Sequence, residues 1–157
     1  MTMKNSVKPV LVLGLGNPLM QDDGVGLEII RKLRERPDFP SDLADIEDGG
    51  TLGPDLLPLL KGRSRVIVAD AVQSEKPAGT LCRFHPTPAS PFQQRLSLHE
   101  SGLEEALSLL ALMGEKPEVE VVGVSVGDSL QFGAPLSQET SAAVEQAARA
   151  VQEAVCN

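Results

Sequence analysis

The sequence predicts an α/β fold, in which a mostly parallel sheet of about five strands is covered by helices on both faces. Nearly continuous apolar runs at 9–15, 65–71 and 119–126 have the composition of buried central strands. Helical segments alternate with these runs, and this alternation favours parallel strands joined by right-handed crossovers. No repeat, linker or low-complexity tract divides the chain, so we expect residues 1–157 to form one domain.

The first half of the chain opens with the strand at 9–15 and continues into a helix at 24–35. That helix is amphipathic, because Val25, Ile29 and Leu33 recur at helical spacing. The elements expected next, in chain order, are a weak strand at 44–47, a short helix at 54–60, the strand at 65–71, a strand at 79–84 and a loop at 86–91.

The second half contains two more helices. Ser101 and Glu104 match the capping-box pattern that opens a helix, and Leu103, Leu107 and Leu110 then share one face. The remaining elements are the strand at 119–126 and a terminal helix at 137–156.

Composition excludes several classes of function. The formal net charge is −8, and the chain has four Phe but no Trp or Tyr, which disfavours a nucleic-acid partner. The two cysteines, Cys82 and Cys156, are too few for a zinc cluster or a disulfide framework, so we expect reduced thiols in a cytoplasmic protein. We expect no signal peptide, and no apolar run approaches the roughly 20 residues of a membrane span.

Chemistry-bearing residues follow the predicted strands. Asp22 and Asp23 come after the first strand, Asp70 ends the strand at 65–71, and His99 precedes the helix that opens at Ser101. Residues that follow parallel strands gather at one edge of the sheet. Two carboxylates and an imidazole suit a first-row divalent cation, so the sequence predicts a metal site there.

Structural roles compete with this interpretation at several positions. Asp22 directly precedes a helix, where a carboxylate can cap free N–H groups and meet the positive end of the helix dipole. We expect His85 to be solvated, and 47–50 (Glu-Asp-Gly-Gly) to form a tight turn or a backbone surface near the site. Gly14 and Gly16 begin a dinucleotide pattern, but Leu19 stands where its third glycine belongs.

Four motifs, in this order, resemble the NiFe-hydrogenase maturation endopeptidases. They are GLGNPLMQDDGVG with its following helix, DGG at 48–50, IVADAV around Asp70 and LHE around His99. The resemblance spans about residues 11–154. It implies a three-layer α/β sandwich and a single cut that removes a C-terminal extension from the hydrogenase large-subunit precursor after nickel insertion. The family's nickel-recognising residues carry over to Asp23, Asp70 and His99.

We expect the free enzyme to hold the metal weakly or not at all, because two carboxylates and one imidazole leave open coordination positions. The precursor would supply the remaining ligands and the nickel, and we expect the enzyme to be a monomer. The catalytic nucleophile is not identified by the sequence. Neither a Ser-His-Asp nor a Cys-His arrangement nor an H-E-x-x-H helix is evident, so the protease assignment depends on the resemblance. Asp23 and Asp70 are the candidate catalytic residues of the aspartic-type endopeptidase that the resemblance implies.

Three alternatives remain open at this point. One is a non-catalytic nickel-binding or chaperone protein on the same fold. Another is a phosphorelay receiver-like domain, although such a domain needs a lysine after its last sheet strand and Val126 is followed by Gly-Asp-Ser. The third is a peptidyl-tRNA hydrolase, which shares the GLGNP run but continues with a histidine–asparagine element that is missing after Pro18.

Overall fold

The computed structural model describes residues 7–50, 53–86, 95–96, 100–127 and 131–157. Its elements, in chain order, are β1 (Val10–Leu15), the 3-10 helix η1 (Gln21–Gly24), α1 (Val25–Glu35), β2 (Ala44–Gly50), the 3-10 helix η2 (Gly53–Leu56), α2 (Leu57–Leu60), β3 (Arg65–Gln73), β4 (Leu81–Phe84), β5 (Arg95–Leu96), α3 (Glu100–Leu112), β6 (Glu118–Val126) and α4 (Gln138–Cys156).

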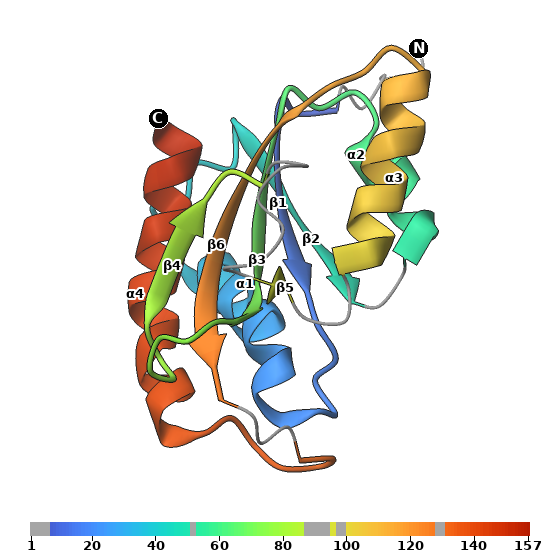
Figure 1. Cartoon of the computed structure of the whole chain (residues 1–157). Helices are drawn as coiled ribbons and strands as arrows, with labels where there is room; N and C mark the ends of the chain where they lie inside the picture. Colours follow the sequence, from blue (N-terminus) through green and yellow to red (C-terminus); the bar gives the residue numbers. More distant parts are fainter. Residues whose placement is uncertain (1–6, 51–52, 87–94, 97–99, 128–130) are drawn as a thin grey trace.

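The strands form one mixed, mostly parallel sheet in the order β2-β1-β3-β6-β4, and β5 pairs with β3. β1, β2, β3 and β6 are mutually parallel, whereas β4 and β5 are antiparallel to their neighbours. In Figure 1 the arrows of β1, β2 and β6 point the same way and that of β4 points back. The expected parallel core is therefore confirmed, and β5 is a strand that sequence analysis did not predict.

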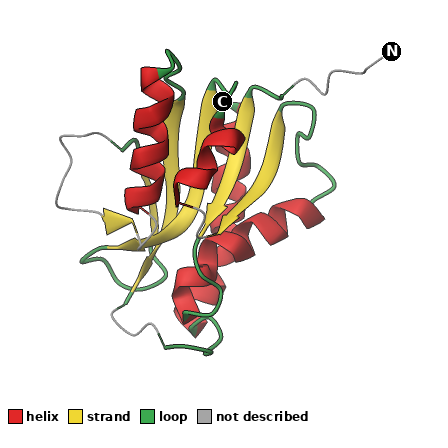
Figure 2. Ribbon diagram, turned by 90° about the vertical axis from the view of Figure 1, so that its right-hand side faces the viewer, coloured by secondary structure: helices red, strands yellow, loops and turns green. Residues whose placement is uncertain are grey.

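Helices cover both faces, which gives the three layers that the resemblance implied. α1 and α4 pack on one face through Ile29, Val144, Val151 and their neighbours. α2 and α3 pack on the other face through a leucine-rich cluster that includes Leu60 and Leu110. Figure 2 looks onto the α2–α3 face, with α1 and α4 behind the sheet.

Several predicted boundaries were wrong. β2 extends to Gly50 and β3 to Gln73, because pairing with β1 and β6 continues past the apolar residues that define each strand in the sequence. β4 begins at Leu81 rather than at 79. α3 begins at Glu100, so Ser101 falls inside its first turn rather than before it. The expected loop at 86–91 lies almost wholly outside the described residues.

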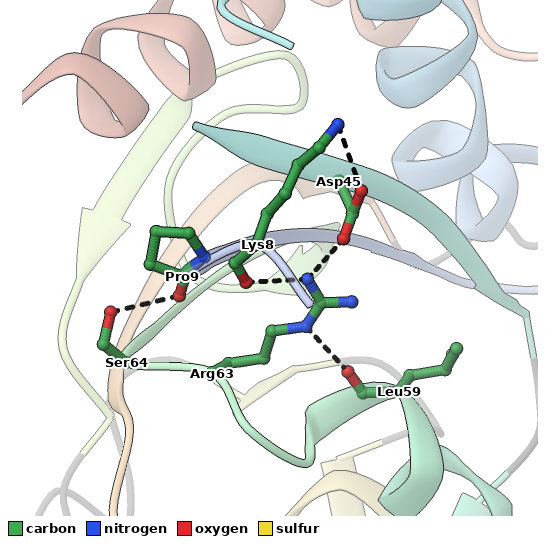
Figure 3. A network of polar contacts seen from close by, with 6 residues as sticks. All are labelled: Lys8, Pro9, Asp45, Leu59, Arg63 and Ser64. Carbon is green, nitrogen blue, oxygen red and sulfur yellow. Dashed lines mark hydrogen bonds and ion pairs between the residues drawn. The ribbon is translucent and has the colours of Figure 1, made fainter. Parts of the chain in front are cut away.

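A buried arginine joins the amino ends of the strands, opposite the predicted site. The guanidinium of Arg63 donates to Lys8 O at 2.9 Å, Asp45 Oδ2 at 2.5 Å and Leu59 O at 3.2 Å (Figure 3). Lys8 Nζ lies 3.4 Å from Asp45 Oδ1. The hydrogen bond from Arg63 lowers the pKa of the Asp45 carboxyl below its ordinary value. This network fixes the start of β1 and β2 to the turn before β3.

No helix in the described part of the chain is long and apolar enough to cross a membrane.

Candidate functional site at the carboxyl edge of the sheet

The loop after β1 folds back on itself and buries Asp23. The Asp23 carboxylate accepts a hydrogen bond from Asn17 N at 2.9 Å, and Asp23 N donates to Met20 O at 3.1 Å. Asn17 also accepts from Leu19 N through its side chain at 3.0 Å. As a result Asp23 is only 1% exposed although it lies in a loop at the sheet edge.

Glycines allow this loop to approach the sheet. Gly16 has a φ of 133°, and a Cβ there would lie 2.0 Å from the carbonyl oxygen of Asp23. A Cβ on Gly26 would lie 2.3 Å from the carbonyl oxygens of both Leu15 and Ala69. The glycines of the first motif therefore seat α1 across the ends of β1 and β3. This packing accounts for the glycine-rich sequence without a phosphate ligand.

Asp70 lies inside β3 rather than after it. Asp70 pairs with Gly123 of β6, and its side-chain Oδ1 accepts a hydrogen bond from Ala71 N at 2.8 Å. Because side chains alternate along a strand, Asp70 shares a face with Val68 and Val72, which pack toward α3. Asp70 is fully buried, at 0% exposure.

The fold brings Asp23 and Asp70 to the same edge. β1 pairs with β3 only as far as Ala69, so Asp70 stands level with the point where β1 gives way to the loop. η1, which carries Asp23, packs against β3 beside this point. Gly26, three residues after Asp23, closely approaches the carbonyl oxygen of Ala69, the residue before Asp70.

His99, the third predicted ligand, lies outside the described residues. Among the residues that the structure does describe, no group of three His, Cys, Asp or Glu side chains could hold a metal ion. α3 begins one residue after His99 and packs against η2, where a Cβ on Gly102 would lie 2.5 Å from Gly53 Cα. η2 in turn follows the carboxyl end of β2, so α3 starts at the edge that carries Asp23 and Asp70.

The sequence suggests that Asp22 caps α1, but in the structure it does not. η1 and α1 carry no side-chain cap at their first turns. Instead, Asp22 accepts hydrogen bonds from Ser137 N at 2.7 Å and from Ser137 Oγ at 2.8 Å. Ser137 is the N-cap of α4, and its Oγ accepts from Thr140 N at 3.3 Å. Asp22 is therefore structural, but it joins the first motif to a helix at the far end of the sequence.

The 48–50 (Asp-Gly-Gly) segment is not the expected tight turn. It forms the end of β2, with a bulge opposite the step from Gly14 to Leu15 of β1. A Cβ on Gly49 would meet three leucine side chains at 2.8–2.9 Å, so the glycine leaves room for this leucine packing. Gly50 O also accepts from Gly16 N at 3.1 Å, which ties the segment to the start of the Asp23 loop.

The described residues contain no nucleophile–histidine pair of the kind used by serine or cysteine proteases. Cys82 is buried on β4 and its sulfur lies 3.7 Å from Thr80 O. Cys156 is exposed at the end of α4. His85 is exposed, as predicted, with its Nδ1 3.0 Å from Val119 O. The two buried carboxylates therefore remain the chemically distinctive groups of the described edge.

Comparison with known proteins agrees with this geometry. Residues 27–154 match the hydrogenase maturation protease family. The hydrogenase 2 maturation protease of Escherichia coli (strain K12) is 39% identical over 142 residues, which cover 88% of this chain and 85% of that protein. The hydrogenase maturating endopeptidase HybD from E. coli superposes with a TM-score of 0.82 at 35% identity and covers 94% of this chain and 91% of its own.

A second solved structure, the NiFe hydrogenase maturation protease HybD from Thermococcus kodakarensis, has a TM-score of 0.79 at 27% identity and covers 93% of this chain and 98% of its own. Together the fold and these relatives define an endopeptidase of hydrogenase maturation. The chain belongs to the hydrogenase maturation protease family. Receiver-like and peptidyl-tRNA hydrolase interpretations are thereby overturned.

Proposed function

We propose that this enzyme removes the C-terminal extension of a NiFe-hydrogenase large-subunit precursor after nickel insertion, and that Asp23, Asp70 and His99 recognise the nickel in the substrate. The nickel is part of the substrate in this proposal, and the free enzyme holds it weakly or not at all. The enzyme acts as a monomer in the cytoplasm, where the free thiols of Cys82 and Cys156 stay reduced.

The observation that supports this proposal most directly is the burial of two carboxylates at one sheet edge. Asp23 and Asp70 are 1% and 0% exposed. Carboxylates withdrawn from water are costly to desolvate, and a divalent cation offsets that cost. In a family of hydrogenase maturation proteases, the cation that accompanies the substrate is the natural candidate.

The chemistry of the donor set fits such a role. Two carboxylates and one imidazole bind first-row divalent metals and leave coordination positions for ligands from the precursor. Held in this way, nickel would fix the position of the scissile peptide and supply Lewis-acid polarisation of its carbonyl or of water. The backbone donors at Asn17 and Ala71 hold one oxygen of each carboxylate, which leaves the orientation of both groups defined before substrate arrives.

The decisive experiment offers purified enzyme the same precursor with and without nickel and follows the size of the large subunit. Asp23→Asn, Asp70→Asn and His99→Ala are expected to abolish or sharply reduce cleavage of the nickel-loaded form. Matched controls are Asp42→Asn, an exposed carboxylate before β2, and His85→Ala, the other histidine of the chain. Normal cleavage by folded Asp70→Asn enzyme, or equal cleavage of both precursor forms, would contradict the proposed nickel recognition.

A further inference from the structure

Two large apolar side chains are left in solvent beside the candidate site. Leu19, in the loop after β1, is 56% exposed, and Phe132, in the loop between β6 and α4, is 78% exposed. Phe39 and Phe84 are packed partly against the two cores, so Phe132 is the most exposed phenylalanine of the described chain. We call Leu19 and Phe132 the apolar rim.

The two loops that carry the apolar rim are fixed to each other. Gly133 N donates to Leu19 O at 2.7 Å, and Gln131 N donates to Gln21 Oε1 at 3.1 Å. These bonds hold the backbone on both sides of Phe132. In Figure 1 the loop after β1 and the loop leading into α4 accordingly lie side by side, at the carboxyl ends of β1 and β6. Backbone strain marks the same place, because Gln21 has a φ of 49°.

Leu19 of the apolar rim lies in the same turn as the carboxylate that we assign to nickel. Leu19 and Asp23 belong to one closed turn, whose hydrogen bonds run from Asn17 to Asp23 and from Asp23 to Met20. A precursor whose metal is held at Asp23 must therefore pass close to Leu19, which lies four positions before Asp23 in the same turn. The loop bearing Phe132 is attached to the same turn, so it borders the same path.

Charge indicates the chemistry of the partner. The chain carries a formal net charge of −8, yet residues 17–21 (Asn-Pro-Leu-Met-Gln) and 131–137 (Gln-Phe-Gly-Ala-Pro-Leu-Ser) contain no charged side chain. An uncharged, apolar border on an acidic protein favours a neutral, apolar segment of the partner.

We infer that the apolar rim docks an apolar segment of the hydrogenase precursor that flanks its nickel site, and so determines how tightly the precursor binds. This inference rests on the proposed function, because the occupant is the precursor. Leu19 and Phe132 are positioned to contribute binding of the polypeptide, whereas Asp23 and Asp70 read its metal. An exposed aromatic residue on a fixed backbone is the kind of side chain that dominates protein interfaces.

The test measures cleavage kinetics of nickel-loaded precursor by Phe132→Ala and Leu19→Ala enzyme. We expect KM to rise about tenfold for Phe132→Ala and severalfold for Leu19→Ala, with kcat within about twofold of the wild type, because the rim binds polypeptide and does not touch the reacting atoms. Phe132→Leu, which keeps an apolar side chain, should recover most of the loss.

The matched control is Leu112→Ala. Leu112 is 86% exposed at the end of α3, and that end lies near the amino edge, where the neighbouring Glu115 accepts from Gly62 N at 2.8 Å. An unchanged KM in both rim variants, or an equal rise in Leu112→Ala, would overturn the inference. If the proposed nickel recognition is wrong, Asp23→Asn and Asp70→Asn enzyme will still cleave the precursor. The KM values of the Leu19 and Phe132 variants test precursor docking separately from that outcome.

Discussion

The link between Asp22 and Ser137 predicts that two adjacent aspartates respond to mutation in opposite ways. Asp22 is 4% exposed and accepts two hydrogen bonds from one residue. Replacing Asp22 with Ala removes both bonds and weakens the attachment of α4. Asp23→Asn, by contrast, is expected to leave stability nearly unchanged while it removes processing of the precursor.

The size of the effect follows from the two bonds. A hydrogen bond to a charged group contributes about 1.5–3 kcal/mol to the free energy of unfolding. Ser137 is only half-buried, so water replaces part of the loss, and we expect Asp22→Ala to cost about 3 kcal/mol. For a domain of this size that corresponds to a Tm about 6–12 °C lower. Asp22→Asn keeps one acceptor and should cost about half as much.

Urea unfolding at pH 7 measures these values, and a double-mutant cycle with Ser137→Ala isolates the link. We expect a coupling energy of about 1–2 kcal/mol between the two positions, because Ser137→Ala removes one of the two bonds. The exposed Asp42→Asn variant is the control. A cost below about 0.5 kcal/mol for Asp22→Ala, or strict additivity in the cycle, would refute the assignment of Asp22 as the anchor of α4.

Three further results are expected. Because Arg63 lowers the pKa of Asp45, the pair stabilises the fold above the ordinary carboxyl pKa of about 3.9 and loses that contribution as the pH falls through the lowered pKa. The difference in unfolding free energy between wild type and Asp45→Asn should therefore be constant near neutrality and shrink below about pH 4. A difference that grows on acidification would contradict a lowered pKa for Asp45. Gly26→Ala should fail to fold or lose several kcal/mol by urea unfolding, since its Cβ would lie 2.3 Å from two carbonyl oxygens, whereas Gly127→Ala, with nothing within 4 Å, should be nearly neutral. Enzyme purified after chelator treatment should retain its Tm and carry no tightly held nickel or zinc by elemental analysis; a stoichiometric, fold-essential metal would argue against a substrate-borne ion.

The elements that could be predicted from sequence are those with a strong local signal. β1, β3 and β6 are predominantly apolar runs, and α1 and α4 have clear helical periodicity, so their existence and the parallel arrangement of the strands follow directly. β5 spans two residues, and the end of β2 is 48–50 (Asp-Gly-Gly), a composition typical of turns. Both depend on pairing with a neighbour that no local pattern reveals.

The residues of the candidate site likewise differ in how far the sequence predicts their roles. The positions of Asp23 and Asp70 at one edge follow from strand order and parallel direction, which the sequence indicates. The prediction for Asp22 named the wrong partner. The sequence suggests that Asp22 caps the adjacent helix α1, whereas its observed partner, Ser137, lies 115 positions away. Ser137 carried a weak signal of its own, since it opens the terminal helix, but nothing local joins it to the first motif. The assignment of His99 stays a prediction.

The distance in sequence between Asp22 and Ser137 has a consequence for when the enzyme becomes competent. The loop that carries Asp23 is synthesised well before Ser137, the residue that holds its neighbour 115 positions further along the chain. β6, which completes the other side of Asp70, is also made late. We therefore expect the edge that carries Asp23 and Asp70 to become ordered only after β6 and the start of α4 have been synthesised.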